Sequence, residues 1–315
     1  MSKKKKIILS VFSVLLILVI AVCGYAAKVY FDVKNSANTM YEKVDHDNQA
    51  TVKAGEPFSV LLLGIDTGDL GRTDQGRSDT MMVATVNPKK NETTLVSIAR
   101  DTYTEIVGHG TEDKINHAYA FGGAAMSMAS VSKLLNIPIN YYVTVNLKGL
   151  QELVDAVGGI EVDNKLDFSQ DDHHFAIGKL SLNGEEALAY SRMRYEDPNG
   201  DYGRQERQRQ VVAAIAKKAL SINSVTNYQN ILKAMEGNIK TDMTWDEMQN
   251  IALNDRDSFS SIKSDQLQGD GFMQDGVSYQ GISDEELARV RTELDQALDL
   301  DYVNNSSTNS SSVTE

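Results

Sequence analysis

The chain has 315 residues, a single cysteine and a formal net charge of −13. One cysteine excludes a disulfide scaffold and a thiolate zinc site. The acidic balance argues against nucleic acid as a partner, because phosphate backbones are bound through an excess of basic side chains. A chain of this length can bury a core that needs no disulfides.

The N-terminus carries the first clear pattern. Four consecutive lysines occupy residues 3–6, and residues 7–27 are uncharged and rich in Ile, Leu and Val. An apolar run of this length can cross a bilayer as a helix, and its lysine flank stays in the cytoplasm. We therefore predict a cytoplasmic tail at 1–6 and a transmembrane signal anchor at 7–27. The protein would be single-pass type II in the cell membrane, with its folded domain extracellular. Cleavage of the run as a signal peptide is the alternative.

Beyond the anchor, composition divides the chain into three parts. Residues 28–57 are polar and suit a stalk, whereas residues 303–315 are almost entirely Ser, Asn and Thr and are predicted to be disordered. The folded part is then 58–302. Since four of the 31 basic residues and none of the 44 acidic ones lie before residue 28, the remainder of the chain carries a formal charge of −17.

Within the folded part, apolar runs predict strands and the longer periodic segments predict helices. The strands are expected at Phe58–Gly64, Thr80–Val86, Thr93–Ile98 and Tyr141–Val145, and the helices at His117–Leu135, Leu147–Val157, Gly184–Ser191 and Arg204–Leu220. Two capping-box patterns, Thr244 with Glu247 and Ser283 with Glu286, predict the starts of two further helices. This interleaving predicts an α/β fold: a layered α-β-α domain with a central mixed sheet.

Polar motifs stand where the predicted strands begin or end. Asp66 follows the first strand, Asp79 leads into the second, and Arg100 follows the third, while Lys114 and Asn116 precede the long helix. Ligands gather at such strand ends in α/β sheets. None of these motifs matches a dinucleotide fingerprint or a phosphate-binding P-loop.

A window rich in arginine covers residues 190–209. It contains Arg192, Arg194, Arg204, Arg207 and Arg209 in an otherwise acidic protein. Guanidinium groups present forked donors that match phosphate oxygens, so the window predicts a phosphate site. On a helix that begins near Arg204, Gln208 and Arg207 fall on the same side and Arg209 turns away. Arg209 could then be either a ligand contact or a solvated surface charge.

The order of these motifs resembles the LytR-CpsA-Psr family. The resemblance covers residues 58–220 and rests on Leu63-Gly64-Ile65-Asp66, Gly76-Arg77-Ser78-Asp79-Thr80-Met81, Ser97-Ile98-Ala99-Arg100-Asp101-Thr102, Lys114-Ile115-Asn116-His117-Ala118-Tyr119, Tyr190-Ser191-Arg192-Met193-Arg194 and Asp201-Tyr202-Gly203-Arg204-Gln205-Glu206-Arg207-Gln208. Ala99 replaces the proline that is usual in the third block. That change affects a loop and leaves Arg100 in place.

The resemblance implies an enzyme, a phosphotransferase that moves a glycopolymer from a polyprenyl diphosphate carrier to peptidoglycan. It implies Mg²⁺ as cofactor, held by Asp66 and Asp79, with Arg100 and Arg192 as further catalytic residues. The diphosphate would be bound by Arg100, Arg192, Arg194, Arg204, Arg207, Gln208 and Lys114. The base could be Asp66 or Asp201, and the polymer could be teichoic acid, capsular polysaccharide or another wall polysaccharide.

Several readings stay open at this stage. A non-catalytic binder of wall polymers or a transcriptional regulator could share these motifs. Lys114 and Asn116 could simply cap the long helix. The small and flexible residues 121–130 could line a lipid pocket or form ordinary core. The Asp171-Asp172-His173-His174 run suggests either a metal site or an exposed loop, and we expect Trp245 to be a packing residue.

Overall fold

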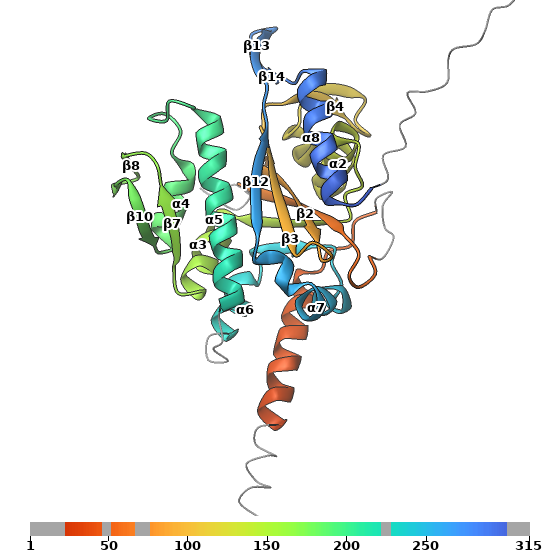
Figure 1. Ribbon diagram of the computed structural model, residues 1–315, viewed down its shortest axis with the longest axis vertical. Coiled ribbons are helices and arrows are strands. Elements are labelled where there is room, and N and C mark those ends of the chain that lie inside the picture. The colour runs from red at the N-terminus through yellow and green to blue at the C-terminus, as the bar shows by residue number, and fades with distance from the viewer. Residues whose placement is uncertain (1–22, 46–51, 67–75, 222–227, 301–315) are drawn as a thin grey trace, which may run out of the picture.

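The computed structural model describes residues 23–45, 52–66, 76–221 and 228–300 (Figure 1). Its strands are β1 (Phe58–Ile65), β2 (Ser78–Asn87), β3 (Glu92–Ile98), β4 (Tyr103–Ile106), β5 (Thr111–Lys114), β6 (Tyr141–Asn146), β7 (Ile160–Asn164), β8 (Phe168–Gln170), β9 (His173–Phe175), β10 (Gly178–Leu182), β11 (Ile239–Thr241), β12 (Ile262–Leu267), β13 (Asp270–Gln274) and β14 (Val277–Gly281). The helices are α2 (His117–Leu135), α3 (Leu147–Ala156), α4 (Gly184–Arg192), α5 (Asp201–Ser221), α6 (Tyr228–Met235), α7 (Trp245–Asn254) and α8 (Asp284–Ala297), with a short 3-10 turn at Arg256–Phe259.

A six-stranded sheet forms the centre, in the order β11-β6-β1-β2-β3-β12. β1 pairs antiparallel with β2 and parallel with β6, and β12 pairs parallel with β3. The predicted mixed sheet is therefore confirmed. Because β1 and β2 run antiparallel, the end of β1 lies beside the start of β2, with Gly64 opposite Thr80.

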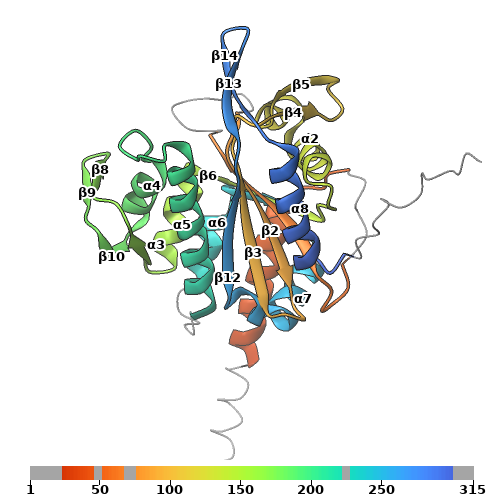
Figure 2. The same cartoon turned by 45° about the horizontal axis from the view of Figure 1, so that its top comes forward.

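Helices cover both faces of this sheet (Figure 2). Side chains alternate along each strand, so Leu61, Leu63 and Val83 point to one face and pack against α2 and α8. Val60, Ala84 and Leu95 point to the other face, where residues of α5 and α7 pack against them. The layered arrangement follows from this two-sided burial.

A second apolar cluster lies beside α5. It joins α3, α4 and the small strands β7–β10 through Val154, Phe168, Phe175 and Tyr190, which are all nearly inaccessible to solvent. Val211 of α5 belongs to the same cluster. α5 thus separates this lobe from the central sheet, as Figure 2 shows.

The predicted strands and helices are all present, with ends that shift by at most three residues. α2 is interrupted near its start by Gly122 and Gly123, the latter at φ +62°. The Thr244–Glu247 capping box is complete. Ser283 likewise accepts from the backbone amide of Glu286. The Glu286 carboxylate does not complete the box, because it accepts from the backbone amide of Gln268 and from Arg289 Nε. The sequence pattern located both helix starts correctly.

The N-terminal helix, residues 23–40, extends from the base of the domain in Figure 1. Most of the predicted anchor, and all of the predicted disordered tail, lie outside the described residues. Among the helices that the structure describes, none is both long and apolar enough to cross a membrane. The predicted stalk is helical up to residue 40, and its end belongs to the domain, because Ala37 and Met40 are buried against Ile239.

Candidate active site

A cavity of about 480 Å³ lies between the central sheet, α5 and the lobe helices α3 and α4. Its charged lining residues and Gln208 lie at or near the ends of strands and helices. They are Asp66 after β1, Asp79 in β2, Arg192 at the end of α4, and Arg204 and Gln208 in the first half of α5. Its apolar lining includes Leu62, Val143, Leu150, Leu153, Val211 and Ile215. Along α5 the lining changes from the polar Arg204 and Gln208 to the apolar Val211 and Ile215, which gives the cavity a charged end and an apolar end.

The antiparallel pairing of β1 and β2 brings the two aspartates to this cavity. Ile65 of β1 is paired with Ser78 of β2, and Asp66 and Asp79 are the next residues after them. The two aspartates therefore lie near the same end of the strand pair. Asp66 Oδ1 accepts a hydrogen bond from the Arg77 amide at 2.9 Å. The aspartate that sequence places after β1 is thus fixed by the chain that enters β2.

Asp79 opens a chain of alternating charges. Arg100 Nη1 donates to Asp79 Oδ1 at 2.8 Å, and Arg100 Nε lies 3.8 Å from Asp101 Oδ2. Lys114 Nζ lies 2.8 Å from Asp101 Oδ1. Burial lowers the pKa of Arg100, but the neighbouring Asp79 and Asp101 outweigh it and leave the pKa raised. Arg100 therefore keeps its charge beside the cavity.

Asp201 organises the first turn of α5. Its carboxylate accepts from Arg204 and, at 2.9 Å, from Gln205, and Arg194 Nε lies 3.7 Å away. Burial lowers the pKa of Arg204, Asp201 opposes this, and Arg100 and Arg194 add to the lowering. The positive charges of Arg100 and Arg194 thus lie close enough to Arg204 to act on it electrostatically. Such a group of guanidinium groups favours binding of an anion.

The structure brings together most of the predicted site residues. Asp66, Asp79, Arg192, Arg204 and Gln208 line one cavity. Arg100 pairs with Asp79 of the lining, and Arg194 is linked to Arg204 of the lining through Asp201. Arg192 is the most accessible of the arginines, with its side chain 53 % exposed and 3.5 Å from Asp171.

Two predicted roles concern the residues before α2. Lys114 is not part of the cavity lining. It pairs with Asp101 and lies 5.6 Å from the centre of the Tyr279 ring, so it contacts the site only through Asp101 and Arg100. Asn116 occupies the N-cap position of α2, but its side chain makes no capping hydrogen bond within the described residues.

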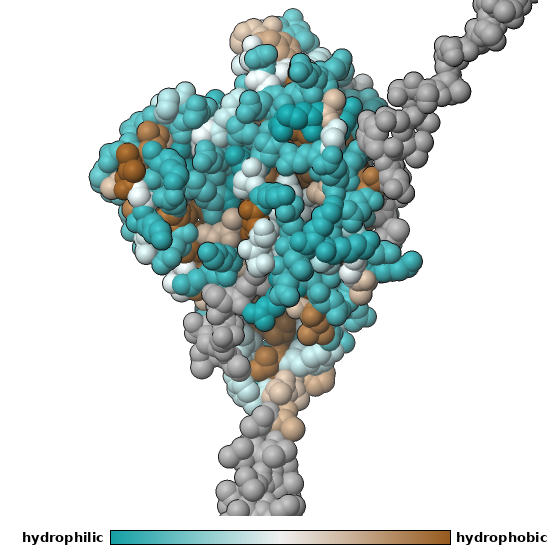
Figure 3. All heavy atoms as spheres, viewed as in Figure 1, coloured by the Kyte–Doolittle hydropathy of each residue, from teal (hydrophilic) through white to brown (hydrophobic). Residues whose placement is uncertain are grey.

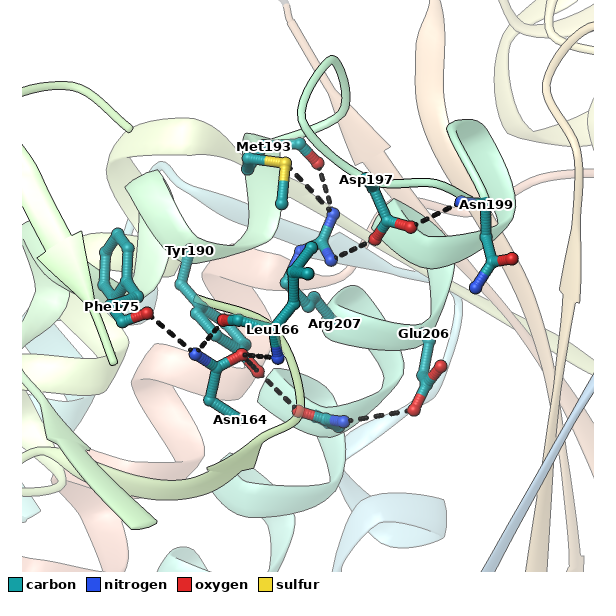
Figure 4. A network of polar contacts seen from close by, with 10 residues as sticks. Asn164, Leu166, Phe175, Tyr190, Met193, Asp197, Asn199, Glu206 and Arg207 are labelled. Atoms are coloured by element: carbon teal, nitrogen blue, oxygen red, sulfur yellow. Dashed lines mark hydrogen bonds and ion pairs between the residues drawn. The ribbon is translucent and has the colours of Figure 1, made fainter. Parts of the chain in front are cut away.

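Arg207 does not face the cavity, and its predicted contact with diphosphate does not fit the structure. Its guanidinium is almost fully buried (Figure 4), with Nη1 2.6 Å from Asp197 Oδ2 and Nη2 donating to the Met193 carbonyl at 2.6 Å. It also lies 5.2 Å from the centre of the Phe168 ring. Helical spacing placed Arg207 near Arg204, but Asp197 and the lobe occupy that sector of α5.

Arg209 is likewise buried, at 5 % exposure, so its interpretation as a surface charge is wrong. Its Nη2 donates to Gln266 Oε1 of β12 at 3.0 Å. Burial lowers its pKa. Arg209 turns away from the cavity as predicted, yet it turns toward the sheet instead of solvent.

Sequence reasoning missed Asp197, the partner of Arg207. One signal was available, because Gly203 stands in the first turn of a helix, where glycine is unfavourable. A Cβ at Gly203 would lie 1.9 Å from Asp197 Oδ2, so the Asp197 carboxylate needs that glycine. Gly203 thus indicates a group packed against the start of α5.

Three smaller predictions are also resolved. Residues 121–130 lie in α2 on the opposite face of the sheet and do not line this cavity, but Ala125, Met128 and Ala129 line a separate cavity of about 580 Å³ there. His174 is exposed and pairs with Asp167 at 3.1 Å. Trp245 packs against the cluster that contains Ala37 and Met40, as expected.

The donor set at the cavity is compatible with Mg²⁺. No group of three or more His, Cys, Asp or Glu side chains that could hold a metal occurs among the described residues. Mg²⁺ typically takes one or two carboxylates and completes its shell with water and phosphate oxygens. Asp66 and Asp79, which share one cavity beside guanidinium groups, satisfy that requirement for an ion bound together with a phosphorylated ligand.

Comparison with known proteins identifies the class of this fold and site. The LytR_cpsA_psr family model matches residues 27–296, and the chain belongs to that family. It is 60 % identical over 300 residues to the polyisoprenyl-teichoic acid–peptidoglycan teichoic acid transferase TagU of Enterococcus faecalis strain ATCC 700802 / V583, covering 95 % of this chain and 99 % of that protein. The predicted family is confirmed, and the enzyme class agrees with this name.

Solved structures share the fold. The crystal structure of B. subtilis TagU has a TM-score of 0.62 at 43 % identity, over 78 % of this chain and 97 % of that one. A structure of TagT bound to LI-WTA has a TM-score of 0.66 at 30 % identity, over 81 % of this chain and 96 % of that one.

Proposed function

We propose that the protein is a Mg²⁺-dependent phosphotransferase that moves an anionic glycopolymer from a polyprenyl diphosphate carrier to peptidoglycan. The observation that carries the proposal is the cavity itself, in which arginines and aspartates line one end and aliphatic side chains line the other. A polyprenyl diphosphate has the same division into charged head and apolar tail. The name of the E. faecalis relative supports teichoic acid as the polymer.

The arginines would orient the diphosphate. Arg192 and Arg204 line the cavity, Gln208 lies one turn beyond Arg204, and Arg100 and Arg194 approach from either side. Forked donors on several sides fix the phosphorus for in-line attack, and phosphoryl transfer depends mostly on such positioning and charge stabilisation. Mg²⁺ held by Asp66 and Asp79 would neutralise further charge on the phosphate oxygens.

The transfer step balances without another reactant. A hydroxyl oxygen of peptidoglycan bonds to the phosphorus next to the glycan, and the bond from that phosphorus to the bridging oxygen breaks. Polyprenyl phosphate leaves, a phosphodiester remains, and the hydroxyl proton passes to a carboxylate. Asp66 lies on the cavity wall and accepts from the Arg77 amide, whereas Asp201 is not among the residues that line the cavity. Asp66 is therefore the better placed acceptor of the proton.

The proposal also includes the cellular location and membrane topology of the protein. The uncharged run 7–27 behind four lysines would anchor the chain as a single-pass type II protein, with the catalytic domain outside the cell membrane. Both substrates, the lipid carrier and peptidoglycan, would then be on the same side as the cavity.

The test combines the full chain in detergent with a lipid-linked teichoic acid precursor and peptidoglycan fragments. We expect a coupled product that requires Mg²⁺, disappears with EDTA and is lost in Asp79→Asn. A chain that binds the precursor and yields no product under any metal condition would instead be a non-catalytic polymer binder. Product formation unaffected by both EDTA and Asp79→Asn would contradict the metal-dependent mechanism.

A further inference from the structure

An aromatic cluster stands where the N-terminal helix meets the base of the domain. It comprises Tyr30 and Phe31 of that helix together with Trp245, the first residue of α7, and we name it the aromatic collar. The two helix residues are 42 % and 59 % exposed. Figure 3 shows a largely hydrophilic face with hydrophobic residues near the base and on the lobe at the left. The collar is unrelated to the cavity.

The collar ties the domain to the helix at a defined height. The Tyr30 ring meets the Trp245 ring edge to face at 5.6 Å and the Phe31 ring at 5.5 Å, and Trp245 Nε1 donates to the Tyr30 hydroxyl at 3.4 Å. The joint is therefore built from ring contacts of the kind that holds a fixed orientation.

A second joint lies at the same height. Asp32 Oδ2 accepts from Lys28 Nζ at 2.7 Å and from the Tyr228 hydroxyl at 2.9 Å, and Tyr228 is the first residue of α6. The helix is thus held by α6 and by α7 within residues 28–32. The first residues of α6 and α7, Tyr228 and Trp245, are therefore held at the level of residues 28–32 of the helix.

The sequence fixes where a bilayer would begin. The uncharged run ends at Ala27, and Lys28 is the first charged residue after it. Tyr30 follows Ala27 by three residues, a helical rise of about 4.5 Å. The polar interface of a bilayer is about 5–7 Å deep on each side of its hydrocarbon core. Tyr and Trp are the residues that favour this layer.

We propose that the aromatic collar is a membrane-contact surface that seats the base of the domain in the headgroup region of the bilayer. The proposal rests on the anchor proposed for residues 7–27. It adds that the domain does not swing on its anchor, because the collar and the Lys28–Asp32–Tyr228 contacts hold α7 and α6 against the membrane surface. The cavity would then stand at a constant height above the layer that holds a lipid substrate.

The chain offers a single tryptophan, so Trp245 reports directly on the collar. The full chain is reconstituted in phosphatidylcholine vesicles that contain lipids brominated either near the headgroup or near the methyl end of the acyl chains. We expect Trp245 fluorescence to be quenched more strongly by the shallow bromines than by the deep ones. Equal exposure to aqueous iodide with and without vesicles, and no quenching by either lipid, would overturn the proposal. Stronger quenching by the deep bromines would also overturn it.

A pair of variants separates the collar from general surface effects. Phe31→Ser removes an exposed aromatic of the collar, and Ile177→Ser removes a side chain of the lobe, between β9 and β10, that is 68 % exposed. We expect Phe31→Ser to reduce shallow quenching by at least about twofold and Ile177→Ser to leave it unchanged. Equal effects of both variants would contradict the collar.

Two controls keep the failures apart. Resistance of the vesicle-bound chain to alkaline carbonate extraction tests the anchor alone, so an extracted chain would refute the anchor on which the collar depends. The fluorescence measurement requires no turnover, and it therefore stands whether or not the transferase proposal holds.

Discussion

The two sides of α5 use the same residue type for opposite purposes. Arg204 and Gln208 line the cavity, whereas Arg207, one turn along, is buried against Asp197 and the Met193 carbonyl. A charge-rich motif therefore divides into cavity-facing and structural members according to the sector of the helix that each occupies. We expect the cavity-facing members to control rate and the buried ones to control stability.

The largest effect is expected from the buried side. Arg207→Ala leaves the Asp197 carboxylate, itself 6 % exposed, without its ion-pair partner. Breaking a buried pair in this way typically costs about 3–5 kcal/mol in the free energy of unfolding. Urea denaturation of the full chain in detergent measures it. If stability were unchanged and only turnover fell, Arg207 would belong to the site after all.

Arg192 should behave in the opposite way. Its side chain is more than half exposed and lines the cavity. We expect Arg192→Ala to reduce the transfer rate by about 10²–10³, as for the loss of one anion-hole donor. The free energy of unfolding should change by less than about 0.5 kcal/mol. Lys148→Ala, a change at an exposed helix position, serves as the control and should alter neither quantity.

Gly203→Ala tests the buried side more gently. The new Cβ would collide with Asp197 Oδ2 and displace the partner of Arg207. We expect a loss of about 1–3 kcal/mol in unfolding free energy, which is typical of overpacking. In an Asp197→Ala background the same substitution should become neutral or stabilising, since alanine favours helix by about 1 kcal/mol over glycine. Additive effects in this double-mutant cycle would refute the proposed packing.

The mildest effect concerns Glu293 of α8, which does not line the cavity. Burial, followed by the hydrogen bond to Asp265, raises the pKa of Glu293 to about 7 from an ordinary value of 4.5. Stability associated with protonated Glu293 is present below pH 4.5 and lost as the pH rises through 7. Glu293→Gln should therefore raise Tm relative to the parent at pH 8 and not at pH 4.

Solvent limits the size of that effect. The Glu293 side chain is 35 % exposed, so we expect less than about 1 kcal/mol. The corresponding change in Tm is below about 3 °C for a domain of this size. A gain that is the same at both pH values would show that titration of Glu293 is not its cause.

Local sequence patterns predicted the elements and the residues at their ends. Apolar runs located β1 and β2, and their antiparallel pairing explains why Asp66 and Asp79 line the same cavity. The same local rules failed for Arg207 and Arg209, because a helical wheel gives the direction of a side chain and not what lies there. Arg209 meets Gln266 of β12, which only the tertiary fold brings to α5, and Arg207 meets Asp197 because the loop before α5 folds back onto the helix.

The apolar end of the cavity shows the same limit. Residues 121–130 have the small and flexible composition of a ligand pocket, but α2 lies on the other face of the sheet, where Ala125, Met128 and Ala129 line a separate cavity. The apolar end of the cavity is built instead from α3, β6 and the second half of α5. Composition alone cannot distinguish a core helix from a pocket helix, since both require apolar side chains.

The central claim, that one cavity holds both the diphosphate and its lipid tail, is tested most directly by filling the apolar end. Leu150 lines that end, and Leu150→Trp would displace part of a bound tail. Losing two buried methylene groups costs about 1.6 kcal/mol, or somewhat more than tenfold in affinity. The measurement is KM for donors with long and short polyprenyl tails, with exposed Leu253→Trp as the control. We predict a rise of at least about tenfold for the long-tailed donor alone. An unchanged KM, or an equal rise for both donors, would contradict the claim.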